Sequence, residues 1–371
     1  MARAIDELIA EIQSHHQALD SLAEEAEQTG NAPEALVDIM RELHLPMVKV
    51  PKEVGGDELG LADQLRYFAA LAYANPTAAW VGFNHAGAGS IAAARLPEAG
   101  LAEVFGDDAT PFFAGVAAPS GRLERTEDGG ILNGTWRFAS GCNHASWAAV
   151  TALEKSDQPM PLMCVISRDD FTLNGDWDVM ALKGTGSINI VCENVHVPTH
   201  RLLNPFQPPL RGGPIYSIPV GVYVAGENLG FTLGVTERFL DEAIAYAKTK
   251  SNMFGKALAS RGAFQYEIGK AQTQINSVRA LAINTLGEAQ TSCAANGQLA
   301  PVEEQKVLAM LAYGTELCAQ VTSHIYHFLG ASTLFEKNIL QRCFRDIHGS
   351  AQHAIASNEA YDRFGATLLE A

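Results

Sequence analysis

The chain has 371 residues, of which 47% are hydrophobic and only 18% are charged, and its formal net charge is −16. Typical soluble proteins carry about 25% charged residues, so an unusual share of this chain avoids water in a core, in subunit interfaces or in a membrane. The acidic balance disfavours nucleic-acid binding, which uses a basic surface, and the hydrophobicity excludes intrinsic disorder.

Residues 1–108 are predicted to be helical. The opening segment MARAIDELIAEIQ is amphipathic and has no long apolar stretch, so we expect no signal peptide. The apolar residues that recur at helical spacing are Ile5, Leu8, Ile9, Ile12, Leu36, Ile39, Met40 and Leu43.

The segment Tyr67–Ala94 contains no Asp, Glu, Lys or Arg and is long enough to span a bilayer. It also contains Asn84 and His85, and the pair Asn75-Pro76 is typical of a break between two helices. We therefore favour two buried helices over a membrane span.

Residues 109–212 are predicted to form a small antiparallel β domain of six to eight strands, because short apolar runs alternate with turn signals. Asn133-Gly134 predicts a hairpin turn, since both residues tolerate positive φ. The alternation of apolar residues shifts phase within Ser187–Val197, which indicates a β-bulge near Glu193-Asn194.

Residues 213–371 return to a helical pattern, with a loop rich in Pro and Gly before them. One apolar stripe follows residues 304–328, and Pro301 favours a helix start. The predicted fold is mainly α with a central β domain, divided into residues 1–108, 109–212 and 213–371.

Several catalytic signatures are missing from the sequence. We find no G-x-G-x-x-G after a strand, no P-loop, no H-E-x-x-H and no G-x-S-x-G. His324 and His327 share a helix face, but the Glu-x-x-His pairs of a di-iron bundle are lacking, so we expect no metal. The six cysteines are scattered without a C-x-x-C pair, which favours buried thiols in a reducing cytosol.

Three clusters carry candidate chemistry. Trp136–Trp147 places small and hydroxyl residues between aromatics, which suits a flat ligand or an ordinary aromatic hairpin. Lys183–Ser187 has two glycines that flank hydroxyl residues, which indicates a tight turn or a close approach to a ligand. Arg342–His353 contains Arg345-Asp346, often a structural ion pair, and His353, which is either a base or a satisfied core histidine.

In this order, the three clusters resemble the acyl-CoA dehydrogenase superfamily over nearly the whole chain. The segment Trp177 to Ser187, followed by Asn-Val-His-Val-Pro, resembles the second β-domain signature of the family, and Lys250–Lys256 with Gln265 resembles its helix-start motif. The resemblance implies an N-terminal helical domain, a small antiparallel β domain, a C-terminal four-helix bundle and a homotetramer around a flavin.

Two positions depart from the common dehydrogenases. The catalytic Glu that follows the family's Arg-Asp pair falls on Ala354, and alanine cannot remove a proton. The Arg that reaches a neighbouring subunit's flavin nucleotide falls on Ser251, which leaves both FAD and FMN open. Some branches place the Glu on another helix, so the dehydrogenase alternative also stays open.

The segments Phe-Ala-Ser-Gly-Cys-Asn-His-Ala and Arg-Asp-x₆-His resemble instead the two-component flavin-dependent monooxygenases of the same fold. This resemblance implies a cytoplasmic enzyme that takes reduced FMN or FAD from a separate reductase and uses O2, through a C4a-hydroperoxyflavin, to oxidise a small aromatic substrate. The resemblance places Ser140 beside flavin N5, His353 as a base near the substrate, and His85 in the pocket wall. The implied cofactor-binding residues are Phe138, Ala139, Ser140, Gly141, Thr185, Phe254, Gln265 and Gly330.

Two alternatives remain beside the monooxygenase. One is an acyl-CoA dehydrogenase or other flavin oxidoreductase, and the other is a non-catalytic flavin-binding or scaffold homologue. The identity of the substrate and the choice between dimer and tetramer stay open.

Overall fold

The computed structural model describes residues 2–106, 108–251 and 255–370. The chain forms two compact units. Unit 1 contains residues 1–59, 77–179 and 183–217, and unit 2 contains residues 60–76, 180–182 and 218–371. The predicted combination of a mainly helical chain with a central sheet is confirmed.

Unit 1 combines short helices with the sheet. Its α-helices are α1 (Ile5–Ser14), α2 (His16–Thr29), α3 (Glu34–Glu42), α5 (Pro76–Arg95) and α6 (Glu98–Phe105). The predicted apolar face of the first helix is confirmed in part, since Leu8 and Ile12 are buried. Within α5, nearly every residue from Thr77 to Ala94 is buried.

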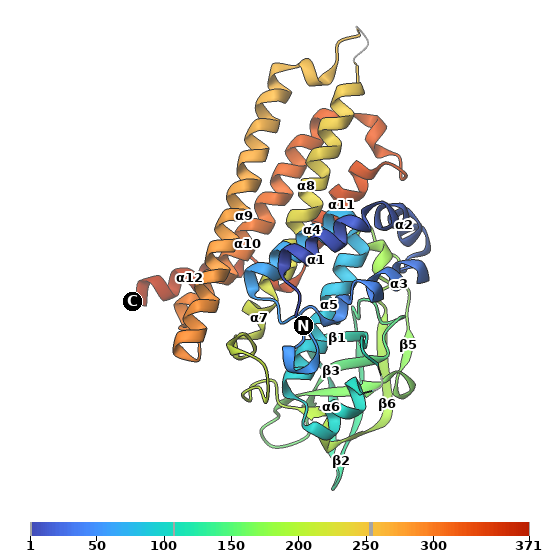
Figure 1. The fold of residues 1–371 in the computed structure, drawn as a ribbon, viewed down its shortest axis with the longest axis vertical. Coiled ribbons are helices and arrows are strands. Elements are labelled where there is room, and N and C mark those ends of the chain that lie inside the picture. The colour runs from blue at the N-terminus through green and yellow to red at the C-terminus, as the bar shows by residue number, and fades with distance from the viewer. Residues whose placement is uncertain (1, 107, 252–254, 371) are drawn as a thin grey trace. The chain divides into compact units, whose positions relative to one another are not determined.

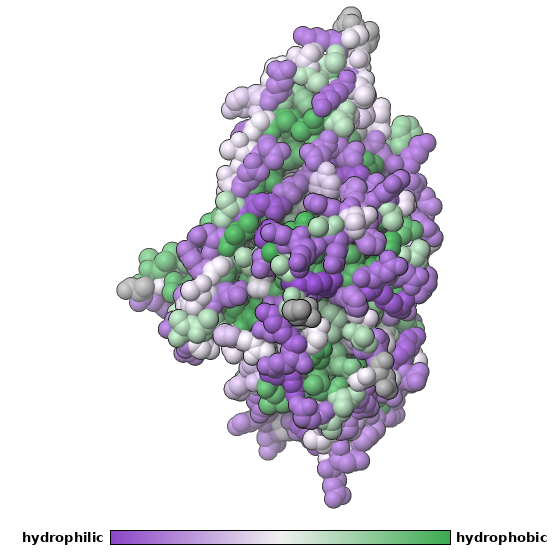
Figure 2. All heavy atoms as spheres, viewed as in Figure 1, coloured by the Kyte–Doolittle hydropathy of each residue, from purple (hydrophilic) through white to green (hydrophobic). Residues whose placement is uncertain are grey.

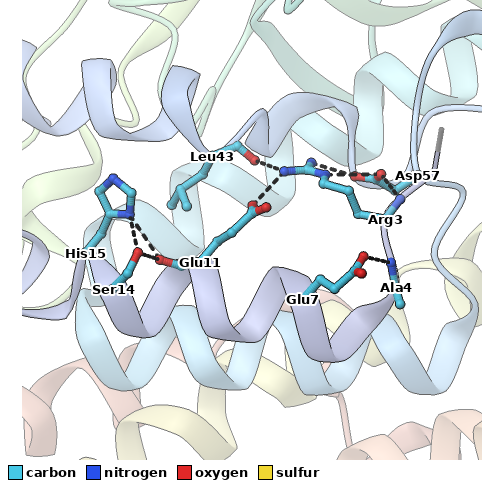
Figure 3. A network of polar contacts seen from close by, with 8 residues as sticks. All are labelled: Arg3, Ala4, Glu7, Glu11, Ser14, His15, Leu43 and Asp57. Atoms are coloured by element: carbon cyan, nitrogen blue, oxygen red, sulfur yellow. Dashed lines mark hydrogen bonds and ion pairs between the residues drawn. The ribbon is translucent and has the colours of Figure 1, made fainter.

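The start of the chain is fixed to unit 1 by Arg3 (Figure 3). Its guanidinium donates to both carboxylate oxygens of Asp57, at 2.6 and 3.3 Å, to Glu11 at 2.8 Å and to the carbonyl of Leu43 at 3.1 Å. Because the Asp57 side chain is only 6% exposed, its negative charge depends on this partner.

We predict that Arg3→Ala lowers the free energy of unfolding by about 3 kcal/mol, because it leaves the Asp57 carboxylate buried without its cation. Denaturant unfolding followed by circular dichroism measures the loss. The matched control is Lys155→Ala, whose ion pair with Glu124 is exposed and should cost less than about 0.5 kcal/mol. Equal effects of the two variants would contradict the structural role of Arg3.

Among the described residues, the sheet of unit 1 has seven strands in the order β5-β6-β2-β1-β3-β4-β7. The strands are β1 (Phe113–Arg125), β2 (Gly129–Trp136), β3 (Trp147–Glu154), β4 (Pro161–Ser167), β5 (Thr172–Asn174), β6 (Asn189–Pro198) and β7 (Leu202–Leu203). The predicted number of strands is confirmed. The sheet is mostly antiparallel, as predicted, and its one parallel pair in the described ranges is β1 with β3.

The predicted hairpin turn at Asn133-Gly134 is wrong, because β2 runs straight through both residues. A Cβ at Gly134 would lie 2.7 Å from the Cα of Gly121 and 2.9 Å from the Trp136 indole. Gly134 therefore allows the indole to pack across two strands. The chain turns instead between β1 and β2, after Arg125.

The predicted bulge at Glu193-Asn194 is confirmed. The pairing of β2 with β6 shifts register between Leu132 and Gly134, and Asn194 has a φ of 55°. The backbone N–H of Asn194 donates to the side-chain oxygen of Asn133 at 2.8 Å. The side chain of Asn133 therefore stabilises the bulge on the neighbouring strand instead of forming a turn.

Unit 2 is a helical bundle. Its helices are α4 (Leu61–Ala74), α7 (Val220–Tyr223), α8 (Ala225–Thr249), α9 (Gly262–Asn296), α10 (Pro301–Leu329), α11 (Ile339–Ser350) and α12 (Glu359–Glu370). The long helices α8, α9 and α10 lie side by side (Figure 1). The predicted break at Asn75-Pro76 is confirmed, since α4 ends before it and α5 begins at Pro76.

The position of α4 bears on the division of the chain. This helix packs against α8, so residues 60–76 group with the C-terminal bundle. The division into residues 1–108, 109–212 and 213–371 stays a prediction.

The low charge of the chain has a structural counterpart in buried helices and in exposed apolar side chains. None of the helices in the described ranges is long and apolar enough to cross a membrane. All six cysteines are buried thiols, as predicted.

Leu368 and Leu369 at the end of α12 are 57% and 90% exposed, and Figure 2 shows hydrophobic residues beside the C-terminus.

Candidate active site

The turn of residues 138–141 in unit 1 connects β2 to the segment that leads into β3. Its backbone is held to residues 185–188: the N–H of Ala139 donates to the carbonyl of Ile188 at 3.1 Å, and that of Gly141 to the carbonyl of Thr185 at 3.0 Å. These bonds bring the Trp136–Trp147 and Lys183–Ser187 clusters together at one place.

Four buried polar side chains meet at this turn. The Trp80 indole donates to Oγ of Ser140 at 3.2 Å, Oγ of Ser140 lies 2.8 Å from Oγ of Ser187, and Oγ of Ser187 lies 2.7 Å from Oγ1 of Thr185. Each of the four residues is at most 6% exposed. The hydroxyls therefore form a continuous hydrogen-bonded row in the interior of unit 1.

His85 on α5 lies against the same turn. Its Nδ1 is 2.7 Å from the carbonyl of Phe113, and because a carbonyl only accepts, Nδ1 carries the proton. Its Nε2 is fully buried and has no hydrogen-bond partner within the described part of the chain. Burial lowers the pKa of His85 from 6.5 to about 4. The ring is therefore neutral at pH 7 and presents a buried acceptor.

This pKa predicts a pH dependence of stability. Between pH 6.5 and about 4 the unfolded chain binds a proton at His85 that the folded chain does not, so stability falls as the pH is lowered, by about 3 kcal/mol over the window. Denaturant unfolding at several pH values, compared between the native chain and His85→Gln, measures this contribution. Identical pH profiles for the two proteins would contradict the neutral, buried state of His85.

Gly141 makes the contact between the turn and His85 possible. Its φ is +72°, and a Cβ there would lie 2.6 Å from Cγ1 of Val81 and 2.7 Å from Nε2 of His85. Glycine is thus required both by the backbone conformation and by the space available.

Phe138 precedes the buried part of the turn and projects outward. Its φ is 62°, which is unusual for a bulky residue, and its side chain is 62% exposed. The ring meets the edge of Trp177 at a centroid distance of 6.2 Å, and the Arg137 guanidinium lies 5.1 Å from its centroid. An aromatic surface with a neighbouring cation is therefore presented next to Ser140.

Gly184 and Gly186 are explained by packing and by backbone conformation. A Cβ at Gly184 would lie 2.3 Å from Oγ1 of Thr77, and Gly186 has a φ of +53°. The glycines therefore serve protein packing and a tight turn. The hydroxyls of Thr185 and Ser187 contribute the polar groups of the site.

The remaining predicted residues lie in unit 2. His353 follows α11, is exposed, and accepts a hydrogen bond at Nδ1 from the N–H of Ile355 at 3.4 Å. Gln265, in the first turn of α9, donates to the carbonyl of Ala259 at 2.9 Å. Gly330 ends α10 with a φ of 79°. Phe254 lies outside the described residues.

Arg345 and Asp346 both hold the short segment 180–182, which belongs to unit 2. The N–H of Leu182 donates to Oδ1 of Asp346 at 2.7 Å, and Arg345 donates to the carbonyl of Met180. Leu182 has a φ of 55°, so the carboxylate stabilises an uncommon backbone conformation. This segment directly precedes Lys183, where the hydroxyl-bearing cluster begins.

The structure thus brings together Phe138, Ala139, Ser140, Gly141, Thr185 and His85. The sequence prediction missed Trp80 and Ser187, although both stand in segments that it singled out. His324 pairs with Glu267 at 3.0 Å, and no group of three or more metal-ligating side chains occurs among the residues that the structure describes.

The fold and these motifs define the class of protein. Residues 8–96 match the N-terminal domain of acyl-CoA dehydrogenases, and residues 229–358 match the acyl-CoA dehydrogenase C-terminal domain. The chain belongs to the acyl-CoA dehydrogenase superfamily.

Two relatives within this superfamily are named as monooxygenases. The indole-3-acetate monooxygenase of Pseudomonas putida is 26% identical, over 86% of this chain and 82% of the relative. The oxygenase subunit HsaA of a flavin-dependent monooxygenase from Rhodococcus jostii is 27% identical, over 92% of this chain and 93% of the relative.

Solved structures show the same fold. The 3-HSA hydroxylase of Rhodococcus sp. RHA1 superposes with a TM-score of 0.89 at 22% identity, covering 98% of this chain and 97% of the other. XiaF from Streptomyces sp., solved in complex with FADH2, superposes with a TM-score of 0.88 at 22% identity, covering 99% of this chain and 96% of XiaF.

Proposed function

We propose that this protein is the oxygenase component of a two-component flavin-dependent monooxygenase that oxidises a small aromatic substrate. The observation that carries the proposal is Ala354, the exposed first residue of the short helix after His353. It stands where the common dehydrogenases of the superfamily carry their catalytic carboxylate, and a methyl group cannot take the α-proton of a thioester.

The residues of unit 1 fit a flavin. A flat ring system with polar edges needs an aromatic or apolar surface and a few fixed hydrogen-bonding groups. Exposed Phe138 supplies the first, and the buried hydroxyl of Ser140 and the unpartnered Nε2 of His85 supply the second. When bound, reduced flavin supplies the electrons that activate dioxygen.

The protein residues then have separate roles. Ser140 hydrogen-bonds to the flavin at N5, and Phe138, Ala139, Gly141 and Thr185 shape the surface around it. His85, held by the Phe113 carbonyl, accepts a hydrogen bond from a bound group in the pocket. His353 acts as the base for the substrate hydroxyl or ring proton.

Cofactor residues of unit 2 and the assembly complete the proposal. The distal part of the flavin is held by Gln265, Gly330 and Phe254. The protein is a homotetramer in the cytoplasm, and a separate flavin reductase supplies it with reduced flavin. Assembly is supported by apolar side chains exposed on α9 and α12, namely Tyr266, Leu281, Ile283, Leu368 and Leu369.

The test measures the binding of reduced and oxidised FMN and FAD under anaerobic conditions, and then follows the reoxidation of reduced flavin after oxygen is added. The proposal expects the protein to bind reduced flavin more tightly than oxidised flavin, and to slow the reoxidation of reduced flavin by oxygen when a reductase supplies it. Failure to bind either redox form would favour the scaffold alternative.

An acyl-CoA dehydrogenase remains the second candidate because of Glu227. This carboxylate lies near the start of α8 and is 2% exposed, and a base on another helix would replace the missing Glu at Ala354. Anaerobic titration of the flavin-loaded protein with acyl-CoA thioesters tests this activity. Bleaching of the flavin that disappears in Glu227→Gln would establish the dehydrogenase instead of the monooxygenase.

A further inference from the structure

The hydroxyls of Ser140, Ser187 and Thr185 form one row of hydrogen bonds whose direction can reverse as a unit. Ser140 contacts two protein groups, the Trp80 indole at 3.2 Å and Ser187 at 2.8 Å, and Ser187 in turn contacts Thr185 at 2.7 Å. The indole N–H only donates, so it occupies one lone pair of the Ser140 oxygen whatever else is bound.

The bond between Ser140 and Ser187 has no such fixed direction, since either hydroxyl can donate. If Ser187 donates, both lone pairs of Ser140 are filled and its own proton is available for a third group. If Ser140 donates to Ser187, the Ser187 hydroxyl donates in turn to Thr185. Ser140 then keeps one lone pair that can accept a hydrogen bond from a third group. Rotation of hydroxyl protons interconverts the two patterns without moving a heavy atom.

A flavin presents opposite groups to Ser140 in its two redox states. N5 of oxidised flavin is a hydrogen-bond acceptor, whereas N5 of reduced flavin carries a proton and donates. We propose that Ser187 and Thr185 are positioning residues that let Ser140 donate to oxidised flavin and accept from reduced flavin; this inference rests on the proposed flavin-dependent function.

The roles of the neighbours in this row then differ in a measurable way. With Ser187→Ala, Ser140 still donates to oxidised flavin. Toward reduced flavin its own proton loses its buried acceptor, and an unsatisfied buried donor is costly. Trp80 donates in both states, so its removal weakens both flavin forms alike.

The experiment measures the dissociation constants of oxidised and reduced flavin and the reduction potential of the bound flavin. Ser187→Ala is expected to weaken binding of reduced flavin about tenfold and that of oxidised flavin less than about twofold. The potential then becomes about 30 mV more negative. Ser187→Thr, which keeps a hydroxyl, should restore the native potential, and Trp80→Phe should lower both affinities while leaving the potential unchanged.

Thr185→Val is a second test that does not depend on the folding of Ser187→Ala. It removes the acceptor of the Ser187 proton, so the potential should shift in the same direction. The inference is overturned if Ser187→Ala and Thr185→Val leave the potential unchanged, or if Trp80→Phe shifts it as much as Ser187→Ala does. Absence of flavin binding to the unaltered protein would overturn the proposed function as well, which separates the two failures.

Discussion

Replacing His353 with alanine is expected to lower the amount of product formed per reduced flavin consumed about 100-fold, because a positioned acid or base contributes a factor of this order. Flavin binding should stay unchanged within about twofold, since the proposed role of His353 lies with the substrate rather than with the cofactor. Product and hydrogen peroxide, measured together, give the yield per reduced flavin, and fluorescence titration gives the affinity.

His324→Ala is the matched control for His353→Ala. His324 is also an exposed histidine of unit 2, and it pairs with Glu267. It has no proposed contact with substrate or flavin, so its removal should leave the yield unaltered. A native yield in His353→Ala would remove His353 from the mechanism.

Gly141→Ala is expected to destabilise the chain by about 4 kcal/mol and to abolish flavin binding. The new methyl group would overlap Val81 and His85, at 2.6 and 2.7 Å, in a backbone with a φ of +72°. Overpacking costs about 1–3 kcal/mol, and a left-handed conformation costs about 1 kcal/mol more for alanine than for glycine. Denaturant unfolding measures the first effect and flavin titration the second.

Gly287→Ala provides the comparison for this prediction. Gly287 lies within α9, and a Cβ there would meet nothing within 4 Å. Alanine is the better helix former, so this variant should be more stable by about 0.5–1 kcal/mol. If Gly141→Ala proves as harmless as Gly287→Ala, the close contact of the turn with His85 is wrong.

The sequence predicted those parts of the fold that depend on local chemistry. Pro76 cannot continue a helix from Ala74, so the break between α4 and α5 followed from one residue. Asn133-Gly134 shows the opposite case. Its turn propensity is overridden because Gly134 packs against Gly121 and the Trp136 indole, contacts that depend on strand pairing and not on the two residues themselves.

The candidate site divides in the same way. Ser140 and Gly141 belong to one short motif, and their assignment to the flavin site follows from the resemblance and stays a prediction. Trp80 and Ser187 reach the same hydroxyl from positions 60 and 47 residues away in sequence, and no local pattern indicates which distant residue will meet it. The uncharged segment Tyr67–Ala94, which carries both Trp80 and His85, is the available signal, and the resemblance places only His85 of this segment in the pocket wall.

The most direct test of the proposed function is oxygen-isotope labelling. The protein, a flavin reductase and a panel of phenols and indoles are incubated under 18O2, and the products are analysed by mass spectrometry. A monooxygenase predicts one 18O atom in the product and one in water. Unlabelled product, or conversion of all the reduced flavin to hydrogen peroxide with every compound of the panel, would contradict the proposed function.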